Sequence, residues 1–395
     1  MHSVWNACQK ACRLLQDLLI ILSGKPAERI PGKVLIVRID ATGDYLLFRG
    51  ALRRLRESNA FRGSELVLCG NALWQNLATK LDGDLFDEFI PVDVQRMRHE
   101  STYRKTLLAT IKKQGADICL NPAFSRNYLS DVLALASGAR RKVGFASTAL
   151  NIGAVAKGLT DNFYHERVEL KRAYEFELHI TDRFLEHLGV RTATEIFQQG
   201  TKELLATFFL KEELHTLKGR PVLFLGANSP DRRWPARNFA RLALFIKDHT
   251  GLFPLFTGGN DVREDTARSI PSEFISHDIT SRTSLLELCI LIAEAPFVVS
   301  NDSFAAHIAS ACAVPTLIIS NGQHAGRFHP YPENIAPGTV TIYPPSITFG
   351  ANAIRKLYYS ASPYEITDIS PNAVCEALNR LLLGDLAGPV ANNFM

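Results

Sequence analysis

Short apolar runs alternate with amphipathic helical patterns along most of the chain, beginning at Lys33. A run such as Val34–Ile39, which is apolar at successive positions, is typical of a strand buried on both faces of a sheet. Strands that alternate with helices are joined by crossovers and lie parallel to one another. The pattern therefore predicts an α/β protein with parallel sheets that are covered by helices on both faces.

In the first half, the pattern predicts one Rossmann-like, doubly wound domain. Its strands are expected at residues 34–39, 65–69, 86–92, 117–120 and 142–145, and its helices near residues 44–57, 101–113 and 127–136. Between Gly144 and Lys218 the alternation weakens, and helical patterns appear at 174–188 and 201–217. The linker between domains is expected in this stretch.

From Pro221 the alternation restarts and predicts a second Rossmann-like domain, with strands at 222–225, 252–256, 297–299 and 316–320 and helices at 236–247, 285–294 and 303–312. The final helical pattern, Pro371–Leu383, is expected to cross back and brace the first domain. Two doubly wound domains that face each other form a cleft at the carboxyl ends of their sheets, where ligands bind. The expected divisions are an N-terminal helix at 1–31, domains at 32–200 and 201–370, and a C-terminal helix and tail at 371–395.

Length and composition fit this organisation. The 395 residues suffice for two domains that each bury a core, and 46% hydrophobic and 21% charged residues are close to the globular average. The net charge of +4 comes from scattered basic residues, which argues against a nucleic-acid partner. A mildly basic surface still suits anionic substrates or an anionic membrane face.

The seven cysteines are odd in number and contain no C-x-x-C pair. This argues against a disulfide framework and against a zinc site, so a reducing, cytoplasmic location is expected. Four of them lie in apolar runs and are interpreted as small core residues, namely Cys69, Cys119, Cys289 and Cys312.

The N-terminal segment, Met1–Leu22, has apolar residues spaced as on one face of a helix. Charged residues interrupt it, so it is too short to span a membrane, and it lacks the cleavage signature of a secretory signal. Two interpretations stay open, a helix on the bilayer surface and a helix packed on its own domain, of which the second is favoured.

Charged residues and a glycine follow the first predicted strand directly, in Arg38-Ile-Asp40-Ala-Thr-Gly43-Asp44. Gly43 permits a tight strand-to-helix connection, and Asp44 could cap the helix. Alternatively, Asp44 is a catalytic base that takes a proton from an acceptor hydroxyl. Taken alone, these residues favour the cap.

Two glycine-containing loops follow strands of the second domain. The first runs from Gly226 to Pro235 and carries Arg232, so a strand, a glycine loop and a helix start could bind a phosphate. The second holds Gly258 and Gly259, which line a nucleotide pocket or only form a turn.

A third polar segment, Asn301–His307, follows the next strand. Asp302 or Ser303 can cap a helix that carries His307, which is a ligand contact or a satisfied core histidine. The loop from Asn321 to Pro330 then adds Gly322, His324, Arg327 and His329. A metal site of the three histidines is disfavoured, because neither a carboxylate nor a histidine stands at helical ligand spacing from them. No metal and no cofactor are expected.

In order and spacing, these motifs resemble glycosyltransferase family 9, the lipopolysaccharide heptosyltransferases and their relatives, over residues 33–383. The resemblance covers Arg38–Asp44, Gly226–Pro235, Thr257-Gly-Gly, Ser284-Leu-Leu-Glu-Leu and Asn301–His307. It implies a GT-B fold and a metal-independent, inverting transfer from a nucleotide sugar, typically ADP-heptose. The implied acceptor is a lipid-linked saccharide at the cytoplasmic membrane face, so peripheral contact with the inner membrane is left open.

The resemblance also assigns roles to residues. Asp44 matches the catalytic aspartate of the family, and Arg232 stands where the family usually has a phosphate-binding lysine. The expected donor- and substrate-binding set is Arg38, Gly43, Gly226, Arg232, Gly258, Gly259, Asp302, Ser303, His307, Gly322 and Arg327.

Phe304 departs from the family, which has glycine at this position. A large ring there is expected to crowd the diphosphate or reshape the donor pocket, so the donor sugar stays open. The alternatives are a transferase with another donor acting on another polysaccharide, and a non-catalytic nucleotide-sugar-binding relative. A dinucleotide oxidoreductase is disfavoured, because no G-x-G-x-x-G follows the first strand of either domain.

Overall fold

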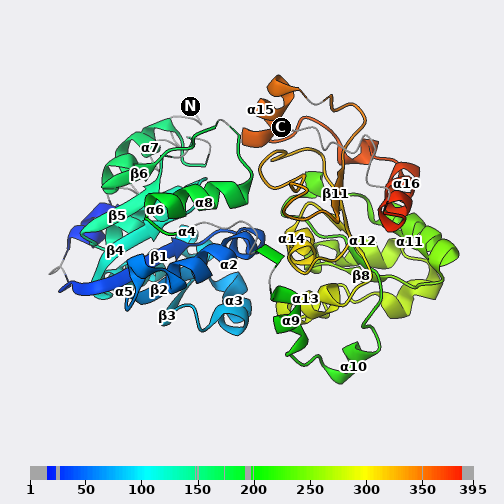
Figure 1. Ribbon diagram of the computed structural model, residues 1–395, viewed down its shortest axis with the longest axis horizontal. Helices are drawn as coiled ribbons and strands as arrows, with labels where there is room; N and C mark the ends of the chain where they lie inside the picture. Colours follow the sequence, from blue (N-terminus) through cyan, green and yellow to red (C-terminus); the bar gives the residue numbers. More distant parts are fainter. Residues whose placement is uncertain are drawn as a thin grey trace. The chain divides into compact units, whose positions relative to one another are not determined.

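The computed structural model (Figure 1) describes residues 16–23, 27–146, 148, 151–172, 174–191, 197–198, 200–348 and 350–384. The chain forms two compact units. The first comprises Met1–Lys171 and Ile180–Thr192, and the second comprises Arg172–His179 and Ala193–Met395. Each unit is built on its own parallel sheet.

The first unit contains a six-stranded sheet in the order β3-β2-β1-β4-β5-β6. Its strands are β1 (Ile30–Arg38), β2 (Glu65–Asn71), β3 (Glu88–Val92), β4 (Ala116–Asn121), β5 (Arg141–Phe145) and β6 (Glu166–Val168). Its helices are α2 (Thr42–Glu57), α3 (Gln75–Asp82), α4 (Val94–His99), α5 (Ser101–Lys113), α6 (Tyr128–Ala136) and α7 (Ala154–Thr160), and α8 (Glu177–His187) begins in the second unit and ends in the first.

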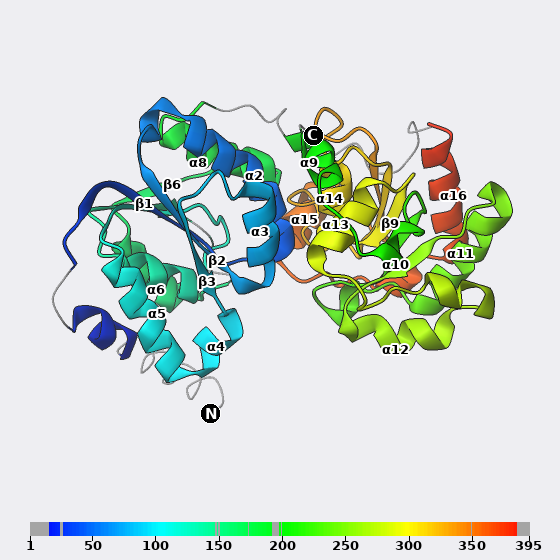
Figure 2. The same cartoon turned by 90° about the horizontal axis from the view of Figure 1, so that it is seen from below.

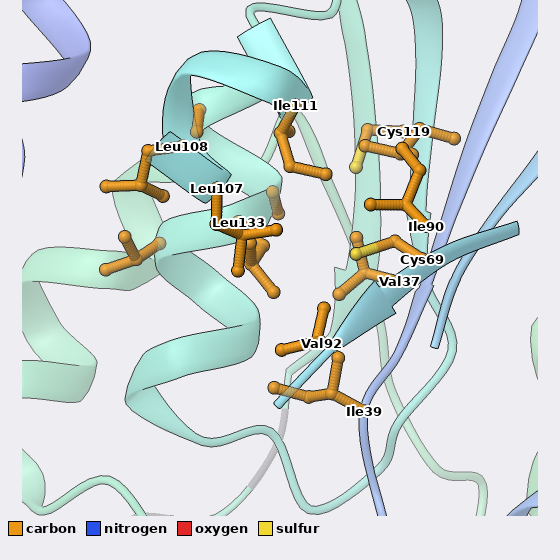
Figure 3. Packing of buried hydrophobic residues seen from close by; sticks show 14 of the residues in the cluster. Val37, Ile39, Cys69, Ile90, Val92, Leu107, Leu108, Ile111, Cys119 and Leu133 are labelled. Carbon is orange, nitrogen blue, oxygen red and sulfur yellow. The ribbon is translucent and has the colours of Figure 1, made fainter. Parts of the chain in front are cut away.

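Helices cover both faces of this sheet, with α5 and α6 on one face and α2 and α8 on the other (Figure 2). In Figure 3, Ile111 of α5 lies on the side of the helix that faces the sheet residues Val37 and Cys119, and all three belong to one buried cluster. β1 is buried on both faces from Val34 onward, which explains its uninterrupted apolar run.

The predicted core role of the four cysteines is confirmed, since all of them are buried. Burial raises the pKa of the Cys119 thiol to about 12. A thiol with so high a pKa stays protonated and behaves as a small apolar group.

The second unit contains a five-stranded sheet in the order β11-β10-β9-β7-β8. Its strands are β7 (Val222–Phe224), β8 (Leu255–Thr257), β9 (Val298–Asn301), β10 (Thr316–Ile319) and β11 (Thr339–Ile342). Its helices are α9 (Thr201–Ala206), α10 (Glu212–His215), α11 (Ala236–Thr250), α12 (Asn260–Ser269), α13 (Leu285–Ala293), α14 (Phe304–Ala311), α15 (Ala351–Tyr359) and α16 (Pro371–Leu382).

The last helix, α16, packs within the second unit. Val374 and Leu378 are fully buried in the same core as Leu242 of α11 and Leu317 of β10. Its apolar face is covered by elements of the second unit (Figure 1), and the expectation that it also braces the first unit stays a prediction.

At the N-terminus, the described part of the predicted amphipathic helix covers residues 16–22. It is held on the first unit by Asp17, whose carboxylate accepts a hydrogen bond from the Tyr128 hydroxyl at 2.5 Å, and by Ile20 and Ile21, which pack on the core. Residues 1–15 lie outside the described part, so a contact with a membrane surface stays a prediction. In the part of the chain that is described, no helix has both the length and the apolarity to span a membrane.

Candidate functional site

The strand orders place one switch point in each sheet. In the first unit, β1 lies between β2 and β4, so the connections after β1 and β4 leave in opposite directions. In the second unit, β7 lies between β8 and β9 in the same way. Ligands of doubly wound sheets bind beyond the carboxyl ends of the strands at such points. The loops after β1 and β4, and those after β7 and β9, are therefore the places to look for chemistry.

Arg38 organises the switch point of the first unit. It is the last residue of β1, it is buried, and its Nη1 donates a hydrogen bond to the carbonyl oxygen of Pro122 after β4 at 3.1 Å. Its Nη2 donates to the carbonyl oxygen of Asp44 at 3.3 Å. Arg38 thus ties both loops together and acts as a structural centre; a direct contact with substrate stays a prediction.

Two carboxylates face this guanidinium. An oxygen of Asp40 lies 3.2 Å from Nε of Arg38, and an oxygen of Asp44 lies 3.9 Å from its Nη2. The Asp44 side chain keeps 22% of its surface exposed. Asp44 is therefore held beside a positive charge and still reaches solvent, and a base needs such access to receive a proton from a substrate.

Asp44 is not the cap of α2. The helix begins at Thr42, its N-cap residue is Ala41, and Ala41 supplies no side-chain hydrogen bond. Asp44 stands in the first turn, where the helix dipole favours a negative charge. Gly43 lies inside the helix, so the strand-to-helix connection is complete before it and does not depend on its flexibility.

In the second unit, Asn301 at the end of β9 joins the two switch-point loops. Its Nδ2 donates to the carbonyl oxygen of Leu225 at 2.7 Å, and its Oδ1 accepts from the Trp234 amide at 3.0 Å. Both partners belong to the loop after β7. This cross-link fixes the loop that carries Arg232.

Arg232 and Asp302 form an ion pair at this point. The guanidinium Nη2 contacts the Asp302 carboxylate and also donates to the Asp302 carbonyl oxygen at 2.9 Å. Nε2 of His329 lies 3.1 Å from the same carboxylate. Burial alone would raise the pKa of Asp302, but Arg232 and His329 lower it more, so its pKa lies well below the usual range. Asp302 is therefore ionised at neutral pH.

Ser303 is the cap of α14, as predicted for either Ser303 or Asp302. Its hydroxyl oxygen accepts from the Ala305 amide at 3.3 Å and lies 2.9 Å from the Ser300 hydroxyl. Asp302 is left to its partners Arg232 and His329 and takes no part in capping.

His307 and Arg327 are both buried and engaged within the protein. Nδ1 of His307 lies 2.6 Å from the Tyr331 hydroxyl, which fits the interpretation of a satisfied core histidine. Nε of Arg327 donates to Glu177 at 2.7 Å. Their assignment to donor binding stays a prediction.

Local packing accounts for the glycines. A Cβ on Gly258 would lie 2.5 Å from Cγ2 of Val262, so the packing of the loop after β8 on the start of α12 requires glycine there. Gly322 has φ +90° and faces Ile347. A Cβ on Gly226 would meet the Phe224 ring, and one on Gly259 would meet Asp261. Donor binding by these four glycines also stays a prediction.

Two residues that shape this site lie in polar segments that stand out in the sequence, but the sequence assigned no role to either of them. Asn301 bonds to Leu225, 76 positions away, and His329 to Asp302, 27 positions away. A local sequence pattern cannot predict contacts between residues so far apart. Among the described residues, no group of three His, Cys, Asp or Glu side chains is placed to hold a metal ion.

Two buried histidines predict a loss of stability in mild acid. Burial lowers the pKa of His307 to about 4, and burial together with Arg327 lowers that of His324 to about 4. In the unfolded chain both bind protons below pH 6.5, the ordinary pKa, whereas the folded protein stays neutral there until about pH 4. The free energy of unfolding should therefore fall as the pH drops from 6.5 toward 4.

Thermal unfolding between pH 4.5 and 7.5 measures this loss. We expect the midpoint to fall steadily below pH 6.5, and His307→Gln, which keeps a polar partner for Tyr331, to fall less steeply. A midpoint that does not change over this range would exclude the neutral buried histidines.

Known proteins resemble the chain in part of its sequence and in its fold. Residues 170–358 match the family model for Glycosyltransferase family 9 (heptosyltransferase). No sequence among curated proteins matches. The solved structures with a similar fold include a glycosyl transferase family 9 protein from Veillonella parvula, at 19% identity and a TM-score of 0.62, covering 91% of this chain and 99% of that one.

Two E. coli structures are also similar. ADP-heptose lps heptosyltransferase II shares 19% identity at a TM-score of 0.61, covering 89% of this chain and 99% of its own. Heptosyltransferase WaaC with ADP-2-deoxy-2-fluoro heptose shares 18% identity at a TM-score of 0.66, covering 88% and 99%. The predicted α/β fold of the GT-B type, with two Rossmann-like units, is confirmed. The cleft between domains stays a prediction.

Proposed function

We propose that the protein is a glycosyltransferase that transfers a heptose or a related sugar from an ADP-heptose-like donor. The match of residues 170–358 to the family model and the fold shared with heptosyltransferase structures support this proposal. The proposed acceptor is a lipopolysaccharide or another surface glycan, bound as a lipid-linked saccharide. The observation that carries the proposal is the Arg232–Asp302 pair at the switch point of the second unit.

This pair suits the diphosphate of a nucleotide sugar. Asp302 fixes one end of the guanidinium, and Nε of Arg232 is buried and has no hydrogen-bond partner. A guanidinium held in one orientation can donate to phosphate oxygens and offset the charge that develops on the leaving group. In the E. coli WaaC structures, the protein is bound to ADP or to an ADP-heptose analogue.

The proposed reaction is a single displacement with inversion at the anomeric carbon. Asp44 takes the proton of the acceptor hydroxyl, whose oxygen forms the new bond to that carbon. The bond from the anomeric carbon to the diphosphate breaks, and the nucleoside diphosphate leaves with the electron pair. Arg232 supplies the positive charge, so the proposal requires no metal ion.

A thermal-shift screen with ADP, UDP and GDP and with their sugar conjugates tests donor binding. A ligand that binds the folded state raises the melting temperature, by an amount that grows with its concentration over Kd. We expect ADP and ADP-heptose to give the largest rises. The absence of a rise with every nucleotide and nucleotide sugar would contradict the proposal.

Phe304 favours a second candidate, the same reaction with another donor sugar. Its ring is half-buried at the first position of α14 and packs edge to face on Phe224, with 5.1 Å between the ring centres. Phe224 ends β7, so the aromatic pair lies at the switch point where the proposed donor binds. A donor that must pass this ring is selected by its shape.

Phe304→Gly therefore should change donor choice. We expect the variant to use ADP-heptose more efficiently than the wild type, by about tenfold in kcat/KM, because steric exclusion in a pocket typically amounts to that factor. Competition between ADP-heptose and a second nucleotide sugar measures the ratio. If the wild type and the variant use the two donors in the same ratio, Phe304 does not select the donor. Phe253→Ala, in the same unit, controls for the loss of an aromatic ring.

A further inference from the structure

The loop that follows β10, residues 321–330, is fastened beside the Arg232–Asp302 pair. Nε2 of His329 lies 3.1 Å from the Asp302 carboxylate and 3.0 Å from the carbonyl oxygen of Gln323. Nδ2 of Asn321 donates to the carbonyl oxygen of Asp231, the neighbour of Arg232, at 3.3 Å. The loop is thus fixed against the proposed diphosphate site.

Two neighbouring side chains of this loop have buried polar atoms without a hydrogen bond of good geometry. They are Oε1 of Gln323 and Nδ1 of His324, and the His324 ring has a contact with the backbone of Tyr358. A buried polar atom without a partner costs about 1–3 kcal/mol, so native proteins rarely keep one without a reason. Nε of Arg232, whose Nη2 contacts Asp302, has the same property.

The backbone at His324 is fixed as well. Its φ is +62°, in the left-handed region, where histidine occurs more often than most residues other than glycine. The His324 amide donates to the carbonyl oxygen of Leu357 at 2.8 Å, which fixes this conformation.

The two side chains together select the kind of ligand. Nε2 of His324 lies 3.3 Å from the Gln323 amide nitrogen, so this nitrogen donates and Nδ1 of His324 carries the proton. A donor, Nδ1–H, then stands beside an acceptor, the amide oxygen. If the oxygen and nitrogen of the Gln323 amide exchange places, Nε2 of His324 carries the proton and donates to the amide oxygen. A lone pair on Nδ1 then stands beside the amide NH₂. Either arrangement offers one donor and one acceptor.

A hydroxyl group is the ligand that matches such a pair, because it both donates and accepts. A phosphate only accepts, and so cannot satisfy the acceptor. A cation is disfavoured by Arg232 and Arg327, whose charges, after burial itself, help to hold the pKa of His324 at about 4. A neutral imidazole beside an amide is suited to the hydroxyls of a sugar ring.

We propose that Gln323 and His324 form the subsite that binds hydroxyl groups of the transferred sugar, next to Arg232 at the diphosphate. This inference rests on the proposed function, since it assigns the sugar half of the same donor. It predicts that the two residues contribute to the affinity for the nucleotide sugar and leave the affinity for the free nucleoside diphosphate unchanged.

Calorimetric titration of matched ligand pairs tests the subsite, with ADP and ADP-heptose, UDP and UDP-glucose, and GDP and GDP-mannose as probes. In the wild type, one sugar conjugate should bind more tightly than its nucleotide. Gln323→Met and His324→Phe should each weaken that conjugate about tenfold, the usual effect of a lost hydrogen bond in a buried site, while the nucleotide binds as before. His324→Asn, which tolerates a positive φ and keeps a donor and an acceptor, should restore part of the affinity.

Unchanged nucleotide binding also shows that each variant is folded. The matched control is His277→Phe, in η6 (Ser272–His277) of the same unit, which should bind nucleotide and sugar conjugate like the wild type. Variants that bind the sugar conjugate as tightly as the wild type would overturn the subsite and leave the proposed function intact. The subsite is overturned equally if no conjugate binds more tightly than its nucleotide. A wild type that binds none of the six probes would overturn the proposed function together with the subsite.

Discussion

Asp44→Asn should lose between about 10² and 10⁴ of the turnover rate, the usual contribution of a general base. The amide keeps the size of the carboxylate and its place beside Arg38, 3.9 Å away in the wild type, but it cannot take up the proton of the acceptor. Donor affinity should change little, because Asp44 belongs to the first unit and the proposed donor site to the second. Steady-state rates and calorimetric donor titration separate the two effects.

The control for this variant is Asp87→Asn in the same unit. Asp87 is a partly exposed carboxylate that pairs with Arg56 at 2.7 Å, and an ion pair of this kind contributes little to stability. Its variant should keep wild-type turnover. If Asp44→Asn turns over as fast as Asp87→Asn, another residue is the base.

The Arg232–Asp302 pair predicts the second large effect. Arg232→Met or Asp302→Leu alone leaves one buried charge without its principal partner, which typically costs about 3–5 kcal/mol. For a domain of this size the melting temperature should fall by roughly 10 °C. The double variant removes both charges and should recover much of that loss.

Donor binding should not recover in the double variant, because the charge for the diphosphate is absent there. Loss of a charge-assisted hydrogen bond predicts a fall in nucleotide affinity of about 10- to 100-fold. Differential scanning calorimetry and nucleotide titration of all four proteins give both quantities. A double variant that binds nucleotide like the wild type would show that the pair is only structural.

Arg233→Met is the matched control, since Arg233 is the next residue and carries the same charge. It pairs with Asp261 at 2.5 Å in a more exposed place, where an ion pair contributes about 0–1 kcal/mol. Its melting temperature and nucleotide affinity should stay close to those of the wild type. A loss equal to that of Arg232→Met would mean that net charge, and not the geometry of the pair, governs binding.

The parallel sheets were predictable because their central strands are buried on both faces. Val34–Val37 of β1 and Val298–Val299 of β9 are fully buried, so the apolar run itself identifies the strand. The edge strands β3 and β8 were predicted, at 86–92 and 252–256, but the edge strands β6 and β11 were missed. β6 is only three residues long and mostly polar, and β11 alternates between buried and half-buried positions, so neither forms an apolar run.

Helices were predictable where apolar spacing was long and caps were present. The helix at 101–113 has the predicted bounds, and the helix expected at 285–294 begins at a capping box formed by Ser284 and Glu287. The stretch 201–217 was expected as one helix but forms two, because α9 ends at Ala206 and α10 begins at Glu212. The turn between them interrupts a pattern that continues across it.

The candidate site was predictable in its residues more than in its contacts. The sequence placed Arg232 and Asp302 in loops at strand ends, because parallel strands carry their functional loops at one edge. It could not pair them across 70 positions, and it could not show that Ser303, rather than Asp302, caps α14. Contacts between distant loops depend on tertiary packing, which leaves no local pattern.

Sugar transfer from a nucleotide donor is measured directly by the conversion of both substrates in one reaction. The wild type is incubated with ADP-heptose and with a purified lipopolysaccharide that lacks its heptoses, and ADP and the mass of the saccharide are followed together. We expect equimolar ADP and a saccharide heavier by one heptose residue. If the protein binds the donor under these conditions but transfers no sugar from ADP-heptose or from UDP- and GDP-linked donors, the proposed transfer is contradicted.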